Sequence, residues 1–262
     1  MPGTVTKIAL PGAAGRMGQM IRSVVAEQPE FELAALSEHP DNPLVGSQID
    51  GVSLSADPAA LGIGAGGVIV DFTHPEATLQ HLAIARKTGT AMVIGTTGLK
   101  AEQEQILAEA ARDIPLVYCA NTSVGVTLLA QLVRQVAQQL GQDWDIEIVE
   151  THHNQKVDAP SGTALALGRA AADGRNVALD AVRDSGRDGM TGARKSGDIG
   201  FAVMRGGDIA GEHTVTFFGQ QERIELTHRA TSRSIFARGA LRAAAFAASQ
   251  PAGLYTMDDV LG

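Results

Sequence analysis

The densest group of chemically active side chains lies in one short segment, ETHHNQKVDAPSGTA, at residues 150–164. His152 and His153 are adjacent, and Lys156 follows three positions later. Imidazole and ammonium groups transfer protons near neutral pH, and an ammonium also binds carboxylates. A lone histidine is more often structural, but two adjacent histidines beside a lysine favour a reactive site. The segment therefore predicts proton transfer to a bound anionic small molecule.

The end of the same segment predicts the start of a helix near Ser161. Gly162 and Thr163 would lie in its first turn, where backbone N–H groups favour a carboxylate. We interpret Ser161 as the helix cap rather than a nucleophile, and Asp158 as a residue that orients Lys156 or the turn. The chain has no helical His-Glu-x-x-His pattern and no cysteine pair, so no metal site is expected.

A second group of candidate residues is the glycine-rich segment GAAGRMG at 12–18, which follows an apolar run at 5–10. Gly12 permits a tight turn, and Gly15 lets the backbone approach a pyrophosphate. Gly18 allows close packing of the next helix on the strand, and the helix N-terminus receives negative charge. The segment predicts a nucleotide-binding turn.

The spacing G-x-x-G-x-x-G departs from the usual G-x-G-x-x-G, because Ala13 and Ala14 separate the first two glycines. Alone, the segment is also compatible with a glycine-rich turn that binds nothing. Glu38 strengthens the prediction, since it ends the second expected strand, 20 residues beyond Gly18, where a carboxylate can bind a ribose 2′-hydroxyl.

The elements expected in the first half alternate between strand and helix. Strands are predicted at 5–10, 31–36, 68–72, 91–94 and 116–119, and helices after residue 18, at 73–88 and at 101–112. This alternation predicts a parallel sheet covered on both faces. Ligands of such sheets lie at the carboxyl ends of the strands, and all five ends here carry glycine, hydroxyl or polar clusters.

The pattern changes in the second half. A helix is predicted at 124–140, and strands at 146–151, 200–205, 212–218 and 222–229, the last three joined by turns short enough to demand antiparallel neighbours. Residues 184–199 are predicted to form a long mobile loop that closes on a dianion, with Arg187, Arg194 and Lys195 available to it. The last 30 residues return to helix, with Ile235, Phe236, Leu241 and Phe246 facing the first sheet.

These patterns predict an α/β chain of two domains. Residues 1–122 and 231–262 would form a Rossmann-type parallel-sheet domain that binds a dinucleotide. Residues 123–230 would form an α+β substrate-binding and oligomerisation domain with an open mixed sheet. The net charge of −8 argues against nucleic-acid binding, and no apolar run approaches the length of a membrane span. The N-terminus lacks a basic region followed by an apolar one. We expect a soluble cytoplasmic protein.

Motifs along the whole chain together resemble the 4-hydroxy-tetrahydrodipicolinate reductase family, long called dihydrodipicolinate reductase. They are GAAGRMG, Glu38, GTTG, the segment 121–125, HHNQKVDAPSGTA, IGFAVMRGGDIAGEHTV and LYTMDDVLG. The resemblance implies hydride transfer from NADH or NADPH to a cyclic dicarboxylate imine, with loss of water, on the diaminopimelate route to lysine. It also implies a homotetramer built through the sheet of the second domain.

The resemblance also implies roles for single residues. His152 matches the family's proton donor or acceptor and Lys156 its proton donor, while His153, Gly162 and Thr163 match substrate-binding positions. The cofactor contacts match Gly12, Ala13, Ala14, Gly15, Arg16, Met17, Glu38, Gly95, Thr96, Thr97, Cys119, Ala120, Asn121 and Thr122.

Three positions depart from the family pattern. His39 stands where many members have Arg, Thr122 where many have a large apolar or aromatic residue, and Gln155 where some have a third histidine. Because Glu38 repels a 2′-phosphate and His39 is mostly neutral at pH 7, we expect NADH to serve at least as well as NADPH. Arg16 remains a candidate phosphate contact.

Two other functions fit parts of the sequence. A related two-domain dehydrogenase could act on another substrate, such as a semialdehyde, with Cys119 as nucleophile. However, Cys119 closes an apolar strand and is better explained as a small buried residue. A non-catalytic NAD-binding sensor would need no proton-transfer cluster, so HHNQK argues against it.

Overall fold

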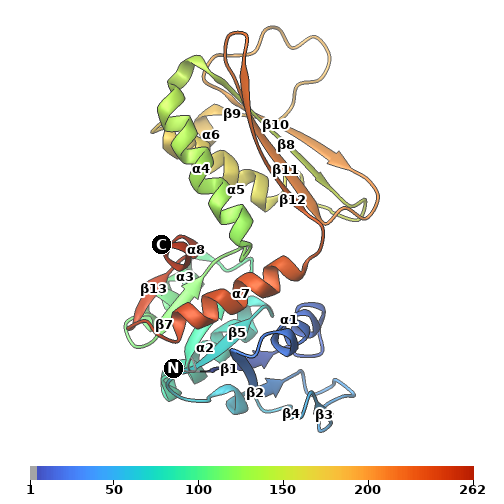
Figure 1. Cartoon of the computed structure of the whole chain (residues 1–262), viewed down its shortest axis with the longest axis vertical. Coiled ribbons are helices and arrows are strands. Elements are labelled where there is room, and N and C mark those ends of the chain that lie inside the picture. Colours follow the sequence, from blue (N-terminus) through green and yellow to red (C-terminus); the bar gives the residue numbers. More distant parts are fainter. Residues whose placement is uncertain (1–4) are drawn as a thin grey trace. The chain divides into compact units, whose positions relative to one another are not determined.

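The computed structural model describes residues 5–262, and the chain divides into two compact units, each with its own sheet (Figure 1). The first unit contains the described residues up to Val124 together with Ser234–Gly262. The second unit is the intervening segment, Gly125–Arg233.

The sheet of the first unit has the strand order β13-β7-β6-β5-β1-β2-β4-β3. Its strands are β1 (Thr6–Pro11), β2 (Phe31–Ser37), β3 (Gln48–Ile49), β4 (Val52–Ser55), β5 (Gly67–Asp71), β6 (Ala91–Ile94), β7 (Pro115–Tyr118) and β13 (Gly253–Tyr255). All neighbouring pairs are parallel except β3 and β4. The predicted parallel sheet is confirmed, although β3, β4 and β13 were not predicted.

Helices cover both faces of this sheet, because its central strands are apolar on both sides. The helices are α1 (Arg16–Glu27), α2 (Pro75–Thr88), α3 (Ala101–Ala110), α7 (Ser234–Ala247) and α8 (Met257–Leu261), with a 3₁₀ turn η1 at Pro58–Leu61. One hydrophobic cluster joins α1 and α7 to residues such as Val68 and Val93, and another joins α2 and α3 to Ile69 and Met92.

The C-terminal helix α7 returns to the first sheet as expected, but its packing surface differs from the prediction. Leu241 is buried, whereas Ile235, Phe236 and Phe246 are only half-buried. The inward face consists mainly of alanines, namely Ala237, Ala240, Ala243, Ala244 and Ala247. Small side chains let the helix approach the sheet closely. The size of a side chain, rather than its hydrophobicity, therefore decides which residues of α7 face the sheet.

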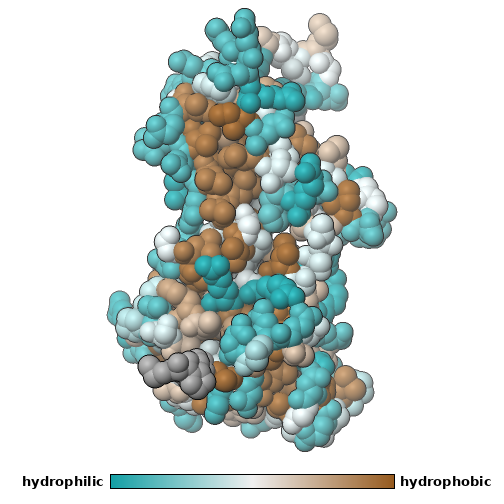
Figure 2. Space-filling model, in the orientation of Figure 1, coloured by the Kyte–Doolittle hydropathy of each residue, from teal (hydrophilic) through white to brown (hydrophobic). Residues whose placement is uncertain are grey.

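The second unit contains a five-stranded mixed sheet with the order β12-β11-β8-β10-β9. Its strands are β8 (Asp145–His152), β9 (Arg183–Asp184), β10 (Ile199–Arg205), β11 (Gly211–Phe218) and β12 (Arg223–Ala230). The helices are α4 (Val124–Leu140), α5 (Gly162–Gly174) and α6 (Leu179–Val182), with a 3₁₀ turn η2 at Gly141–Asp143. Side chains of α4 and α5 share one hydrophobic core with one face of the sheet. The outer side of α4 is apolar, with Leu128 and Leu132 exposed in the region where hydrophobic residues gather (Figure 2).

The expectation that β10 and β11 are antiparallel neighbours is wrong. β8 lies between them, parallel to β10 and antiparallel to β11. The five-residue connection 206–210 crosses the end of β8, where Gly206 N–H donates to His152 O and His153 N–H donates to Ile209 O. These hydrogen bonds satisfy the crossing backbone, so a short turn can span one strand.

Closure of the loop at 184–199 on a dianion stays a prediction, but two of its three cations are already paired with carboxylates. Arg187 pairs with Glu147 and Asp184, and Arg194 pairs with Glu147 at 2.9 Å and Asp145 at 2.8 Å. Glu147 precedes His152 by five residues, about 17 Å along an extended strand, and its side chain points to the opposite face of the sheet. These arginines are therefore engaged away from the histidine segment.

Candidate active site

A cavity of about 730 Å³ lies in the first unit, next to the carboxyl ends of β1, β2 and β5. Five of the predicted cofactor residues line it, namely Gly12, Gly15, Arg16, Met17 and Glu38. The cavity is large enough for part of a dinucleotide, and its position at the strand ends is the one where α/β sheets bind such ligands.

The turn at the cavity entrance depends on two glycines. Gly12 has φ 64°, a left-handed conformation that other residues rarely adopt. A Cβ on Gly18 would lie 2.3 Å from the carbonyl oxygen of Gly12, so α1 packs directly on the turn. No side chain caps the start of α1, which leaves its first turn of N–H groups directed toward an anion.

Glu38 is fixed beside this turn. Its Oε2 accepts a hydrogen bond from Ala14 N–H at 3.0 Å, and its Oε1 accepts one from His39 N–H at 3.0 Å. A carboxylate retains further lone pairs when it accepts two bonds, so it can still accept a ribose hydroxyl. The backbone N–H of Ala14 thus holds the Glu38 carboxylate, while Ala13 is buried in the core.

The remaining predicted cofactor residues do not line this cavity. Gly95, Thr96 and Thr97 follow β6, where Thr96 is buried and donates to Asp71 at 3.3 Å. Cys119, Ala120, Asn121 and Thr122 follow β7, where Thr122 donates its hydroxyl hydrogen to Phe236 O at 2.7 Å. Burial raises the pKa of the Cys119 thiol to about 12, which disfavours Cys119 as a nucleophile.

Thr73 and His81 are among the cavity residues that were not predicted as cofactor contacts. Thr73 lines the wall, and Asp71 holds it through its N–H at 2.8 Å and its hydroxyl at 2.6 Å. The other oxygen of Asp71 contacts His81 Nδ1 at 2.8 Å, and His81 also lines the cavity. Thr73 follows a strand end that was expected to be polar, whereas His81 lies six residues beyond the start of α2 and only the fold brings it to the cavity.

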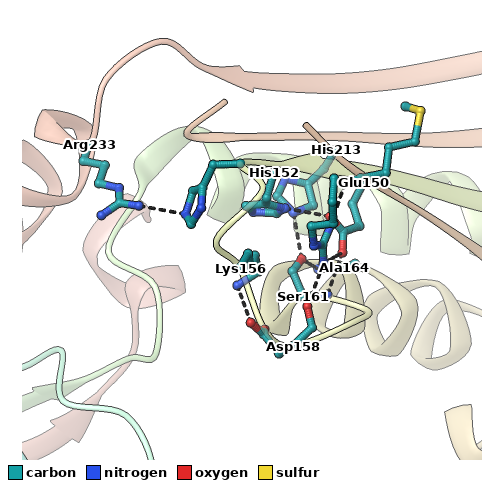
Figure 3. Close-up of polar contacts among 11 residues, drawn as sticks. Glu150, His152, Lys156, Asp158, Ser161, Ala164, His213 and Arg233 are labelled. Atoms are coloured by element: carbon teal, nitrogen blue, oxygen red, sulfur yellow. Dashed lines mark hydrogen bonds and ion pairs between the residues drawn. The ribbon is translucent and has the colours of Figure 1, made fainter. Parts of the chain in front are cut away.

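The second group of functional side chains surrounds the end of β8 (Figure 3). Glu150 and His152 are both buried and point to the same face, because they are two residues apart on one strand. His152 Nδ1 lies 2.6 Å from Glu150 Oε2, and Arg205 on the neighbouring strand donates to both oxygens of Glu150 at 2.7 and 2.8 Å. Neither Glu150 nor Arg205 was among the predicted site residues.

Burial and the neighbouring charges shift the pKa values of Glu150 and His152 in opposite directions. Burial raises the pKa of Glu150, but hydrogen bonds from Arg205, His152 and the Ser161 N–H outweigh it and hold that pKa below its usual value. Burial lowers the pKa of His152, and the neighbouring carboxylate only partly opposes this effect. At neutral pH, Glu150 is therefore ionised and His152 is neutral.

His153 has a different environment from His152, and because β8 ends at His152, strand alternation does not extend to His153. Its Nε2 lies 3.0 Å from Arg233 Nη2 (Figure 3). Because a guanidinium can only donate, this nitrogen of His153 accepts and carries no proton. Arg233, like Glu150 and Arg205, was not among the predicted site residues.

Lys156 lies in the loop between β8 and α5, where its Nζ pairs with Asp158 at 2.7 Å. The expectation that Asp158 orients Lys156 is confirmed. Ser161 is the N-cap of α5 and accepts from Ala164 N–H at 3.1 Å, also as expected. Its hydroxyl further contacts His213 Nε2 at 3.0 Å, and burial lowers the pKa of His213 to about 4, so this imidazole is neutral.

Gly162 and Thr163 are the first two residues of α5, where N–H groups point out of the helix N-terminus. The end of the second unit's sheet thus combines a neutral imidazole, an ammonium and a helix N-terminus, a set suited to bind carboxylates and move protons. Within residues 5–262, no group of His, Cys, Asp and Glu side chains is arranged to hold a metal ion. Nor does any helix in this range have the length and apolarity that crossing a bilayer requires.

Comparisons with known proteins cover both units. The model for the N-terminal part of dihydrodipicolinate reductase matches residues 6–122, and the model for its C-terminal part matches residues 125–261. The chain belongs to the dihydrodipicolinate reductase family.

Members of the dihydrodipicolinate reductase family are similar to it along their full length. A 4-hydroxy-tetrahydrodipicolinate reductase of Rhodopseudomonas palustris (strain BisB18) is 51% identical, with 98% of this chain and 97% of that protein covered. The dipicolinate-bound dihydrodipicolinate reductase from Paenisporosarcina sp. TG-14 has the same fold, with a TM-score of 0.77 at 22% identity over 95% of this chain and 97% of that one. The structure of GenD2 from gentamicin A biosynthesis in complex with NAD shares the fold more distantly, with a TM-score of 0.60 at 14% identity over 100% and 91% of the chains.

Proposed function

We propose that this protein catalyses the NAD(P)H-dependent reduction of 4-hydroxy-tetrahydrodipicolinate to tetrahydrodipicolinate, a step in diaminopimelate and lysine biosynthesis. One observation carries the proposal: in a chain of this reductase family, His152 at the end of β8 and Lys156 in the loop before α5 lie beside the helix N-terminus. The first unit would bind the nucleotide, and the second unit would bind the substrate.

Groups in the second unit would bind the carboxylates of the substrate and transfer the protons that the reaction requires. Lys156, charged beside Asp158, binds a carboxylate and donates a proton. The N–H groups of Gly162 and Thr163 bind a carboxylate at the N-terminus of α5. His152 exchanges a proton, and His153 contacts the substrate from the other side of the strand end. The reaction adds a hydride and a proton and releases the hydroxyl group as water.

A pyridine nucleotide fits the first unit's cavity, and when bound it supplies the hydride. The turn of Gly12–Gly18 and the uncapped first turn of α1 would receive the pyrophosphate, and Glu38 would bind the adenosine ribose. Since Glu38 also repels a 2′-phosphate, NADH should serve at least as well as NADPH. Arg16 and His39 also line the cavity, and Arg16 remains the candidate contact for a phosphate.

The test is NADH oxidation with the cyclic imine formed by condensing pyruvate with aspartate semialdehyde. His152→Gln and Lys156→Ala should each lower kcat by roughly 10²-fold, the usual scale for a positioned acid or base. Lys156→Ala should also raise KM, while NADH affinity stays within about threefold in both variants. Arg169→Ala removes an exposed cation of α5 in the same unit and should change neither constant.

The outcomes separate the proposal from its rivals. A protein that binds NADH without imine turnover would be a sensor, and turnover only with another carbonyl substrate would indicate a related dehydrogenase. Near-normal kcat in both variants would contradict the catalytic roles. Loss of NADH binding in parallel with kcat would show that the segment is mainly structural.

We also propose a cytoplasmic homotetramer formed through the second unit's sheet, the number four being the one expected from the family. The face opposite α5 has no helix of its own unit over it, and Met204 and Phe218 on that face are 53% and 39% exposed. Exposed apolar sheet faces usually acquire a partner. Light scattering that shows a monomer at micromolar concentration would reject the tetramer.

A further inference from the structure

We propose that Glu150, held by Arg205 and Ser161, is a positioning residue that keeps the proton of neutral His152 on Nδ1, so that Nε2 is the nitrogen that exchanges a proton with substrate. The inference rests on the proposed function for its kinetic consequences. The tautomer itself is a property of the free protein and can be measured without turnover.

The hydrogen bonds of Glu150 fix which donor each of its two carboxylate oxygens contacts. Oε1 accepts from Ser161 N–H at 2.9 Å and from Arg205 Nη2 at 2.8 Å. Oε2 accepts from Arg205 Nη1 at 2.7 Å and lies 2.6 Å from His152 Nδ1. An ionised carboxylate can only accept, so Nδ1 must donate. The side chain of Glu150 is 1% exposed, so water does not compete for these positions.

The opposite nitrogen of the ring is left for chemistry. His152 Nε2 makes no hydrogen bond within residues 5–262, and it faces Gly211 on β11, where a Cβ would approach it to 2.9 Å. The absence of a side chain at Gly211 therefore makes room for this side of the ring. With Nδ1 protonated, Nε2 presents a lone pair that can take a proton and return it. Glu150 itself remains ionised throughout.

The charged and titratable groups around His152 come from each packed element. Glu150 is on β8, Arg205 on β10, His213 on β11 and Lys156 on the loop before α5. The His213 ring meets the His152 ring edge to face at 5.1 Å and is neutral. Glu150 raises the pKa of His152, whereas Arg205 and Lys156 lower it. Variants at Glu150 and Arg205 should therefore shift this pKa in opposite directions.

Glu150→Gln reverses the tautomer for a geometric reason. The Oε1 position faces two obligatory donors, Ser161 N–H and Arg205, so the carbonyl oxygen of the glutamine occupies it. The amide nitrogen then faces His152 Nδ1, which must accept, and the ring proton moves to Nε2. The wrong tautomer should lower kcat by about 10²- to 10⁴-fold.

The experiment combines a pH profile with ring-nitrogen spectroscopy. In wild type, the ¹⁵N shifts of His152, assigned by comparison with His152→Gln, should show a protonated Nδ1 and an unprotonated Nε2. The inflection of kcat against pH that His152→Gln abolishes should move to lower pH in Glu150→Gln and to higher pH in Arg205→Gln. Glu147→Gln, on the opposite face of the same strand, should leave the inflection and kcat unchanged.

A structural role alone predicts another pattern, since both variants break the same ion pair and would lower activity equally at every pH. A wild-type His152 protonated on Nε2 overturns the proposal, and so do inflections that do not move or that move in the same direction. If Glu150→Gln does not fold, the tautomer of His152 in wild type and the pH profile of kcat in Arg205→Gln still test the proposal. If wild type does not reduce the imine, the proposed function fails, while the ¹⁵N shifts still test the tautomer.

Discussion

Gly18→Ala tests how the nucleotide turn works. The added Cβ would lie 2.3 Å from Gly12 O and 2.8 Å from Ala13 backbone atoms, whereas ordinary contact begins at 3.4 Å. The start of α1 must therefore move by about 1 Å, and its N–H groups leave hydrogen-bonding distance of a pyrophosphate seated on the turn. Losing one hydrogen bond to a charged group costs about 1.5–3 kcal/mol.

The expected result is a dissociation constant for NADH raised by about 10- to 100-fold, with a smaller change of kcat at saturating NADH. Calorimetric titration measures the binding, and thermal unfolding measures the stability of the variant. Val24→Ala is the matched control, because it removes buried atoms from the same helix without touching the cavity. It should lower stability and leave NADH affinity intact. An NADH affinity within about twofold of wild type in Gly18→Ala would refute the packing argument.

Four further results are expected. Glu38→Gln should raise the ratio of kcat/KM for NADPH over NADH by about tenfold, because the repelling charge is gone; an unchanged ratio contradicts this. Ser161→Ala should lower the free energy of unfolding in urea by about 1–2 kcal/mol, whereas Ser161→Thr should retain most of it. Burial lowers the pKa of His213 to about 4, and the unfolded chain binds that proton near pH 6.5. Stability should therefore fall as pH falls from about 6.5 to about 4, by at most about 3 kcal/mol, and His213→Gln should flatten this slope. Alkylation of Cys119 at pH 8 should be at least tenfold slower than that of a free thiol, because its pKa is raised to about 12; equal rates would contradict the raised pKa.

Local patterns were sufficient wherever a residue's role depends on its immediate neighbours. Helix α4 begins and ends where its apolar stripe does, and β6 coincides with its apolar run. Ser161 caps α5 because the capping hydroxyl and the N–H it accepts from are three residues apart.

Strand order in the second unit was beyond local patterns. The short link between β10 and β11 suggested pairing, but β8, about 50 residues earlier, inserts between them. The length of a connection limits the distance between the two strands that it joins. Five residues are long enough to pass over one intervening strand. The ion pairs of Arg187 and Arg194 in the long loop were not predicted for a related reason, because their carboxylate partners Asp145 and Glu147 are about 40 to 49 residues away.

By itself, the sequence determined the fold class of the first unit and predicted the nucleotide turn and the reactive segment, since each depends on residue types at short, regular spacings. Only the tertiary structure decided what the reactive groups touch. Glu150 appears in the sequence as an ordinary strand residue, and Arg205 lies 55 positions away. Their pairing arises because two strands lie in register, and it is this burial and charge that set the protonation state of His152.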